Sequence, residues 1–204
     1  MSRARTLANG SYIADNAITL DQMAHLGTDG HVLTSTGTGS APAFEAISVA
    51  VLQVLSTTTT AASSAYSDID TWGDIPGMTI AITPASSSNK ILLSFSISLG
   101  YTTQLSAAVK MVRGSTDIGV GDAGGSRHRT WVSQRCIDGQ SYNNVPFNGQ
   151  YLDSPSTSSE ETYKLQWLLP EGSTTVYLNR SLSFADNADI STTASTITVM
   201  EVAG

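Results

Sequence analysis

Strict alternation of apolar and polar residues is the feature that most limits the fold of this chain. From Ile91 to Leu99, large apolar residues occupy every second position, and serines fill three of the positions between them. Because successive side chains of a β-strand point to opposite faces, this pattern buries one face of a strand and leaves the other in water. The same period of two recurs around Ile80, Val109, Leu165 and Val176. The sequence therefore predicts strands, each with one buried face.

Composition favours an all-β fold. Only 13% of the residues are charged, whereas the chain has 29 Ser, 25 Thr and 17 Gly. Threonine suits the solvent face of a strand, and Gly and Ser suit turns. With no long helical pattern, about eight to ten short strands indicate an antiparallel β-sandwich or jelly roll. We place this knob domain at residues 48–204.

Residues 1–47 have a different pattern, with short apolar spots among Gly, Asn, Asp and Thr. Thr19 and Gln22 fit a helix capping box, which predicts one or two helical turns. The Gly-rich stretch after Gly27 has too few apolar anchors to order by itself, so it implies a partner surface. We expect an attachment segment whose docking residues are Leu20, Met23, Leu26, Val32, Leu33 and Phe44.

Two segments, Val49 to Leu55 and Ile197 to Val202, carry apolar residues on both strand faces. Such a strand lies either in the middle of a sandwich or in a subunit interface. The second alternative makes four residues of the C-terminal segment candidates for an interface between subunits: Ile197, Val199, Met200 and Val202.

Several passages resemble virion fibre and knob proteins of marine bacteriophages, the tail-fibre-like proteins. The first is GTDGHVLTSTGTGSAPAFEAIS (Gly27 to Ser48), similar to a glycine-rich module found before the globular tips of phage fibres. The others are KMVRGSTDIGVGDAGGSRHRT, YLDSPSTSSEETYKLQW, and VYLNRS followed by ASTITVMEVAG. The resemblance implies a homotrimer whose knob is similar to the jelly rolls of the complement and tumour-necrosis-factor type. It also implies a terminal strand near the threefold axis.

Charge and cysteine content argue against a nucleic-acid-binding protein and against a disulfide-stabilised secreted domain. The net charge is −7 and only Arg127 to Arg129 form a basic cluster, so we expect no nucleic-acid partner. The single Cys136 cannot form an internal disulfide. No signal peptide and no apolar stretch of membrane-spanning length is present, which predicts a soluble protein made in the cytoplasm of the host.

An enzyme is the less favoured class. The carboxylate pairs Glu160 with Glu161 and Asp186 with Asp189 are the candidates for glycan cleavage, but adjacent strand residues face opposite ways and the second pair is typical of a turn. No G-x-S-x-G motif occurs. His25 and His31 are six residues apart, and in a trimer one of them on the axis could supply three nitrogen ligands to a metal ion. No H-x-H spacing is present, which favours solvated or hydrogen-bonded histidines, so we expect no metal and no cofactor. We also expect no catalytic residue.

The best candidates for receptor binding lie in the run from Gly121 to Trp131. There a flexible Gly loop precedes Arg127, His128, Arg129 and Trp131, groups that bind sugar hydroxyls or anions. The alternative is a plain surface loop, with the tryptophan in the core and the arginines paired with Asp residues. Tyr142 and Phe147 suggest a second, aromatic loop.

Together these features predict a trimeric appendage of a bacteriophage virion. Residues 1–47 dock to a tail or capsid protein, and the knob contacts the host surface, through a glycan or a protein. One alternative is a capsid decoration protein or head fibre, whose knob need recognise nothing. The other, from a different class, is an enzyme that trims host glycan.

Overall fold

A computed structural model describes residues 31–34, 43–46, 50–62, 65–101, 105–136, 141–172 and 175–204. All regular structure in these residues is β, and nowhere in them is there a helix with the length and apolarity needed to cross a membrane. The chain divides into two compact units, Met1–Val49 and Ala50–Gly204.

The described part of the first unit is a two-stranded antiparallel pair. Strand β1 (His31–Thr34) lies beside β2 (Ala43–Ala46), with Leu33 opposite Phe44. Three of the predicted docking residues thus lie in these strands: Val32, Leu33 and Phe44. The other three, Leu20, Met23 and Leu26, and the predicted helical turns lie outside the described residues.

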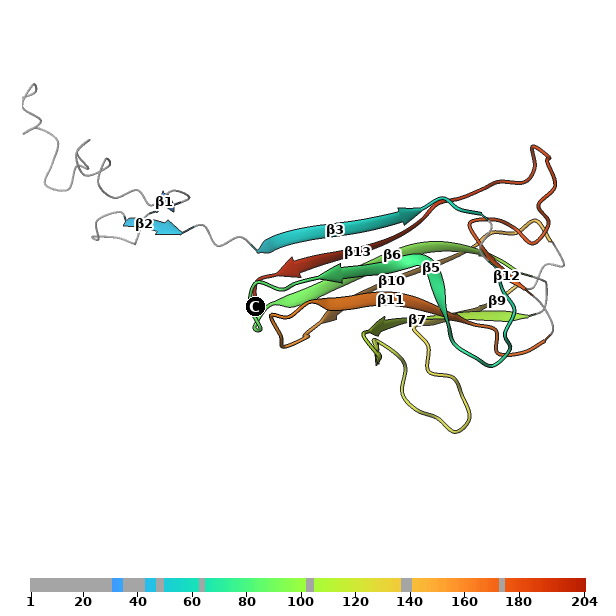
Figure 1. Ribbon diagram of the computed structural model, residues 1–204, viewed down its shortest axis with the longest axis horizontal. Coiled ribbons are helices and arrows are strands. Elements are labelled where there is room, and N and C mark those ends of the chain that lie inside the picture. Colours follow the sequence, from blue (N-terminus) through green and yellow to red (C-terminus); the bar gives the residue numbers. More distant parts are fainter. Residues whose placement is uncertain are drawn as a thin grey trace, which may run out of the picture. The chain divides into compact units, whose positions relative to one another are not determined.

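The second unit is a sandwich of two antiparallel sheets (Figure 1). The first sheet runs in the order β3 (Val51–Thr59), β13 (Ser195–Val202), β6 (Lys90–Gly100) and β10 (Val145–Asp153), with β12 (Val176–Leu178) and β4 (Ala65–Tyr66) continuing beyond the end of β13. The second sheet runs in the order β5 (Gly73–Ile82), β11 (Glu161–Leu168) and β7 (Ser106–Arg113), with β8 (Thr116–Ile118) and β9 (Val132–Arg135) both along the free side of β7.

The core lies between the two sheets and follows the alternation of the sequence. In β6, Ile91, Leu93 and Ile97 point inward and are at most 1% exposed. Met111 and Trp167 face them from the second sheet and are equally buried. The fold is therefore the all-β, jelly-roll-like sandwich that the sequence predicted.

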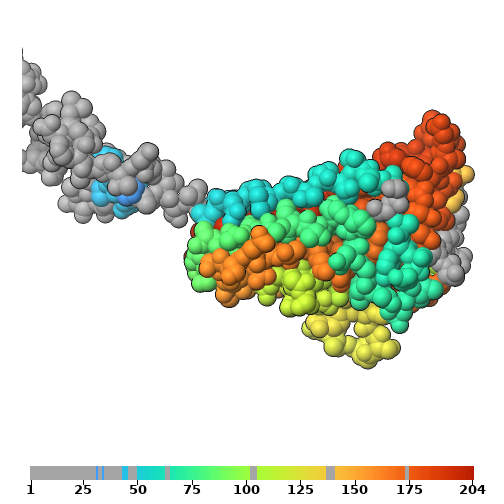
Figure 2. All heavy atoms as spheres, in the orientation of Figure 1, coloured from blue at the N-terminus to red at the C-terminus, as the bar shows by residue number. Residues whose placement is uncertain are grey.

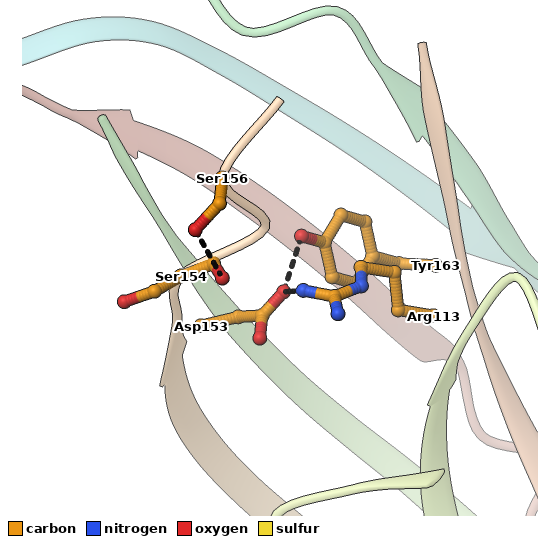
Figure 3. A network of polar contacts seen from close by, with 5 residues as sticks. All are labelled: Arg113, Asp153, Ser154, Ser156 and Tyr163. Atoms are coloured by element: carbon orange, nitrogen blue, oxygen red, sulfur yellow. Dashed lines mark hydrogen bonds and ion pairs between the residues drawn. The ribbon is translucent and has the colours of Figure 1, made fainter. Parts of the chain in front are cut away.

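A buried carboxylate joins the two sheets at one place. Asp153, at the end of β10, accepts hydrogen bonds from Arg113 Nη1 and Tyr163 Oη, both 2.7 Å from Oδ2 (Figure 3). Burial and the hydrogen bond to Asp153 raise the pKa of Tyr163, so the phenol remains a donor. Because Arg113 lies in β7 and Tyr163 in β11, the network connects the end of the first sheet to two strands of the second.

A second buried carboxylate holds the edge strand β3. Glu201 of β13 is fully buried and accepts hydrogen bonds from Gln53 Nε2 (2.6 Å), Asn89 Nδ2 (2.6 Å) and the backbone N–H of Ala85 (2.7 Å). Burial by itself raises the pKa of a carboxyl group, but these donors more than offset it and lower the pKa of Glu201. The carboxylate thus ties β3 and the β5–β6 connection to the last strand.

Candidate functional site

The outer face of the first sheet carries large apolar side chains in register. Val54, Met200, Leu92 and Leu152 are paired in turn across β3, β13, β6 and β10. Val54 is 53% and Leu152 is 48% exposed, while Met200 and Leu92 are half-buried. In the neighbouring row Val51 pairs with Val202. We call these six residues the apolar face: Val51, Val54, Leu92, Leu152, Met200 and Val202.

The predicted interface residues divide between the two faces of β13. Ile197 and Val199 are fully buried in the core of a single chain, so they offer no surface to another subunit. Met200 and Val202 point the other way and belong to the apolar face. The two-sided pattern of this segment arises because β13 lies in the middle of a sheet whose outer face is also apolar.

The other segment with apolar residues on both faces forms β3, and it does not lie in the middle of the sandwich. β3 is an edge strand, because among the described strands only β13 pairs with it. It exposes Val51, Leu52, Val54 and Leu55 to between 38% and 53%. Of the two expected locations for such a strand, the middle of the sandwich is therefore wrong for β3.

Beyond the apolar face, the same outer surface becomes polar but stays uncharged. Two hydroxyl pairs link β3 to β13, Ser56 with Thr198 at 2.8 Å and Thr58 with Thr196 at 3.0 Å. Next to them is a shallow concavity of about 660 Å³, lined by hydroxyls and amides that include Ser96 and Gln150. Among the outward-facing side chains of β3, β13, β6 and β10, only that of Lys90 is charged.

The loop from Gly121 to Trp131 projects from the sandwich, in yellow in Figure 2. Arg127 and His128 line a small pocket of about 240 Å³ at its base, over an apolar floor that includes Leu168. The polar groups of the loop are largely engaged within the chain. His128 Nε2 lies 2.8 Å from Asp70 Oδ1. Arg129 Nε donates to Gly121 O at 2.7 Å, and Arg127 Nη1 donates weakly to Gly124 O at 3.4 Å.

Trp131 packs against neighbouring residues of its own chain. Its ring packs edge-on against Tyr151 at 6.4 Å between centroids, and its Nε1 donates to Asn148 O at 3.2 Å. A side chain at Gly149 would place its Cβ 2.3 Å from Trp131 Nε1, so only glycine leaves room for the indole. Trp131 is thus half-buried at the margin of the core, and it also lines the concavity of about 660 Å³ described above.

The two residues of the predicted aromatic loop are separated by the structure. Tyr142 is 52% exposed in a loop. Phe147, by contrast, is fully buried in β10 and packs against Tyr101, with ring centroids 6.4 Å apart. The prediction of Phe147 as an exposed binding residue is therefore wrong, because the strand begins at Val145 and turns this side chain inward.

An aromatic and arginine cluster beside Tyr142 was missed by sequence reasoning. The Arg180 guanidinium lies 3.7 Å from the Tyr177 ring centroid and 4.6 Å from that of Phe184. The backbone N–H of Ser183 donates to Ser141 O at 2.8 Å, which brings this segment next to the loop of Tyr142. The passage reads as an ordinary polar turn, and only the fold brings the two loops together.

The carboxylate and histidine candidates lie mostly at the surface. Asp186, Asp189, Glu160 and His31 are exposed, and Glu161 is half-buried at the start of β11. Over the described ranges, no group of three or more His, Cys, Asp or Glu side chains is arranged to hold a metal ion. Cys136 is a buried free thiol. His25 lies outside the described residues.

Comparison with known proteins gives only remote likenesses. No protein-family model and no curated protein matches the chain. Among solved structures, the VP2 subviral particle of infectious bursal disease virus is similar with a TM-score of 0.40 and 10% identity, over 84% of this chain and 37% of that one. The Gx strain of the same virus gives a TM-score of 0.31 and 11% identity, over 85% and 42%. The chain thus spans less than half the length of these proteins, and likeness at this level indicates no function.

Proposed function

We propose that this chain is a structural protein of a bacteriophage virion, a homotrimeric tail fibre or spike that docks by its first 47 residues and presents residues 48–204 as a host-binding knob. The observation that carries the proposal is the apolar face. It supports self-assembly, and the sequence resemblance to phage fibre knobs supports the setting in a virion.

The apolar face is unsuited to permanent contact with water. Each square ångström of apolar surface removed from water contributes roughly 25 cal/mol, and soluble monomers rarely expose a contiguous apolar patch of this kind. Protein sheets usually protect an edge strand with charges or prolines, because its free N–H and C=O groups invite pairing. β3 carries neither a charge nor a proline. Further copies of the chain would cover both the face and the edge.

Threefold association follows from the resemblance, in which a terminal strand lies near the symmetry axis. Here the last strand, β13, contributes Met200 and Val202 to the apolar face beside Val54 of the edge strand. Three copies arranged around these residues would bury all three faces together. The loops of each knob, including Arg127, His128 and Arg129, would remain available to a host glycan or protein.

Avidity would supply the strength of adhesion. Three identical weak sites on one knob, and several knobs on a particle, raise the apparent affinity by about a hundredfold to ten-thousandfold without any strong single contact. No cofactor, nucleic acid or membrane insertion enters this function. The protein would be made in the cytoplasm of the host and act in the virion.

Light scattering on the purified full chain tests the assembly. We expect the mass of three chains at micromolar concentration, and a stable monomer under these conditions would overturn the proposal. Cryo-electron microscopy of the whole particle then separates a tail fibre from a capsid decoration protein. We expect threefold density on the tail, whereas density on capsomers would select the alternative.

Deletion of residues 1–47 tests the division of roles. We expect the remaining chain to unfold cooperatively and to keep its oligomeric mass, because the described core lies entirely within the second unit. The same deletion should prevent incorporation into virions. Incorporation at the normal copy number would show that the docking residues lie elsewhere.

A further inference from the structure

We propose that the end of the sandwich farthest from Ala50 binds a neutral pyranose sugar, through Tyr142, Tyr177, Arg180 and Phe184. We call these four residues the distal cluster. The inference rests on the proposed host-adhesion function and assigns it a location and a ligand class.

Strand register fixes the position of the cluster. At one end of β13, Val202 pairs with Val51, and the N–H of Ala203 donates to Ala50 O, so the chain enters the sandwich beside its C-terminus. At the other end, Ser195 pairs with Thr59. Residues 177–193 precede this second end, and Figure 1 shows them in red, opposite the C-terminus. This end is therefore the one farthest from the residue at which the chain enters the sandwich.

Two exposed aromatic rings give the cluster a platform for a sugar. Tyr142 is 52% and Phe184 is 48% exposed, and the hydrogen bond from Ser183 to Ser141 keeps their loops adjacent. The faces of aromatic rings are electron-rich and attract the weakly positive C–H groups on one face of a pyranose ring.

Arg180 provides donors that are held in place. Its guanidinium plane lies against Tyr177 and Phe184, which restricts its rotamers before a ligand arrives. Its Nε is buried and has no hydrogen-bond partner among the described residues. A fixed guanidinium edge can donate to sugar hydroxyls with little loss of side-chain entropy.

Unpaired polar atoms concentrate at the same end. Four buried side-chain polar atoms lack a hydrogen-bond partner in the described chain, and three of them are Asn144 Oδ1, Arg180 Nε and Thr193 Oγ1. They lie in contacting segments, because Asn144 Nδ2 donates to Ser191 O and Arg180 pairs with Thr192. Buried groups without partners cost free energy. Sugar hydroxyls both donate and accept, so they can pair with such groups when the loops open around a bound sugar.

Local charge favours a neutral sugar over an acidic one. Asp186 and Asp189 are exposed in the segment that follows Phe184, and they outnumber the single positive charge of Arg180. A uronic acid would gain from the guanidinium but would be repelled by both carboxylates. A neutral hexose meets no such repulsion.

Amide NMR spectra of the ¹⁵N-labelled full chain test the proposal, with methyl glucoside, methyl galactoside and N-acetylglucosamine as neutral probes and glucuronate as the acidic one. We expect at least one neutral sugar at millimolar concentration to shift signals of residues 142–144, 177–184 and 191–193, and glucuronate to shift them less. Absence of shifts at these residues with all three neutral sugars would overturn the proposal, as would stronger binding of glucuronate.

Variants locate the site. Phe184→Ala and Tyr142→Ala should each weaken the response about tenfold, the effect of losing one aromatic contact. Ile69→Ala, a matched loss of exposed apolar surface outside the cluster, should leave it unchanged. Signals from the rest of the fold report whether each variant is native. Equal binding by all three variants would refute the site. Because light scattering measures assembly independently, a trimer that binds no sugar would refute this inference and leave the assembly part of the proposed function standing.

Discussion

The outer faces of the two sheets differ although both are built from alternating strands. On the second sheet, Asp74 accepts hydrogen bonds from Lys164 Nζ (2.9 Å) and Gln166 Nε2 (2.6 Å). Lys110 there lies 2.7 Å from Asp117 and over the ring of Trp72. The first sheet has the apolar face at one end, hydroxyl pairs beyond it, and Lys90 as the single outward charge of its four long strands.

This difference indicates which face meets water. Lys110 is already covered within the chain, at 7% exposure, but Asp74 is exposed and paired with Lys164. This pair suits a solvated surface and would lose hydration if another chain covered it. Apolar side chains in register, with almost no charge around them, suit a covered surface. We therefore infer that subunits meet through the first sheet and that the second sheet stays outside.

The largest loss of folding stability is expected from a charged residue on the inner face of β13. Val199→Asp places an unpaired carboxylate in the core, which costs several kcal/mol, comparable with about 5–15 kcal/mol for the whole stability of a domain. We expect loss of the native fold, measured by circular dichroism and thermal unfolding. A folded oligomer would show that the core assignment of Val199 is mistaken.

A charged residue at the next position, on the outer face of β13, should prevent assembly while leaving the fold intact. Met200→Asp adds a carboxylate to the apolar face, where a free chain can leave it hydrated. We expect a folded chain that no longer associates, seen by circular dichroism together with light scattering. Thr79→Asp, at an exposed position on the second sheet, is the matched control and should remain oligomeric. Retention of the oligomer by Met200→Asp would place the interface elsewhere.

An intermediate loss of folding stability is expected when the pH is lowered. The pKa of Glu201 is lowered from its ordinary value of 4.5, so below about pH 4.5 the unfolded chain takes up a proton that the folded chain resists. The stability from this carboxylate is therefore complete above that pH and falls as the pH drops toward the folded-state pKa. Glu201→Gln should reduce the free energy of unfolding at neutral pH and flatten its dependence on pH below about 4.5, measured by chemical unfolding between pH 3 and 7. If the free energy of unfolding of Glu201→Gln depended on pH as steeply as that of the unmodified chain, other carboxyl groups would account for the acid sensitivity.

The sequence predicted the core well because burial follows a local rule. Alternation from Ile91 to Leu99 depends only on the geometry of a strand, and all five inward residues are buried. The same rule cannot tell whether an outward apolar residue faces water or another subunit. Residues from both faces of β13 were therefore interface candidates, whereas the structure buries Val199 in the core and leaves Met200 on the outer face.

The sites were harder to predict because they depend on contacts between distant segments. The sequence around Phe147 predicts a loop, since Asn143, Asn144 and Pro146 are typical of turns, but pairing of β10 with β6 makes Phe147 a core residue. Arg180 and Tyr142 are far apart in sequence, and a hydrogen bond between Ser183 and Ser141 brings their loops together. Neither arrangement follows from a local pattern.

The smallest effect is expected from the polar contacts on the second sheet. Asp74 is exposed, and although burial opposes it, hydrogen bonds from Gln166 and Lys164 lower the pKa of Asp74. Pairs at such a surface contribute about 0–1 kcal/mol because water and salt screen them. We expect Lys164→Ala to change the free energy of unfolding by less than about 1 kcal/mol, with the oligomeric mass unaltered. Denaturant unfolding and light scattering on one sample measure both quantities. If Lys164→Ala instead dissociated the oligomer, the second sheet would be the one that subunits share, and the assignment of the two faces would have to be exchanged.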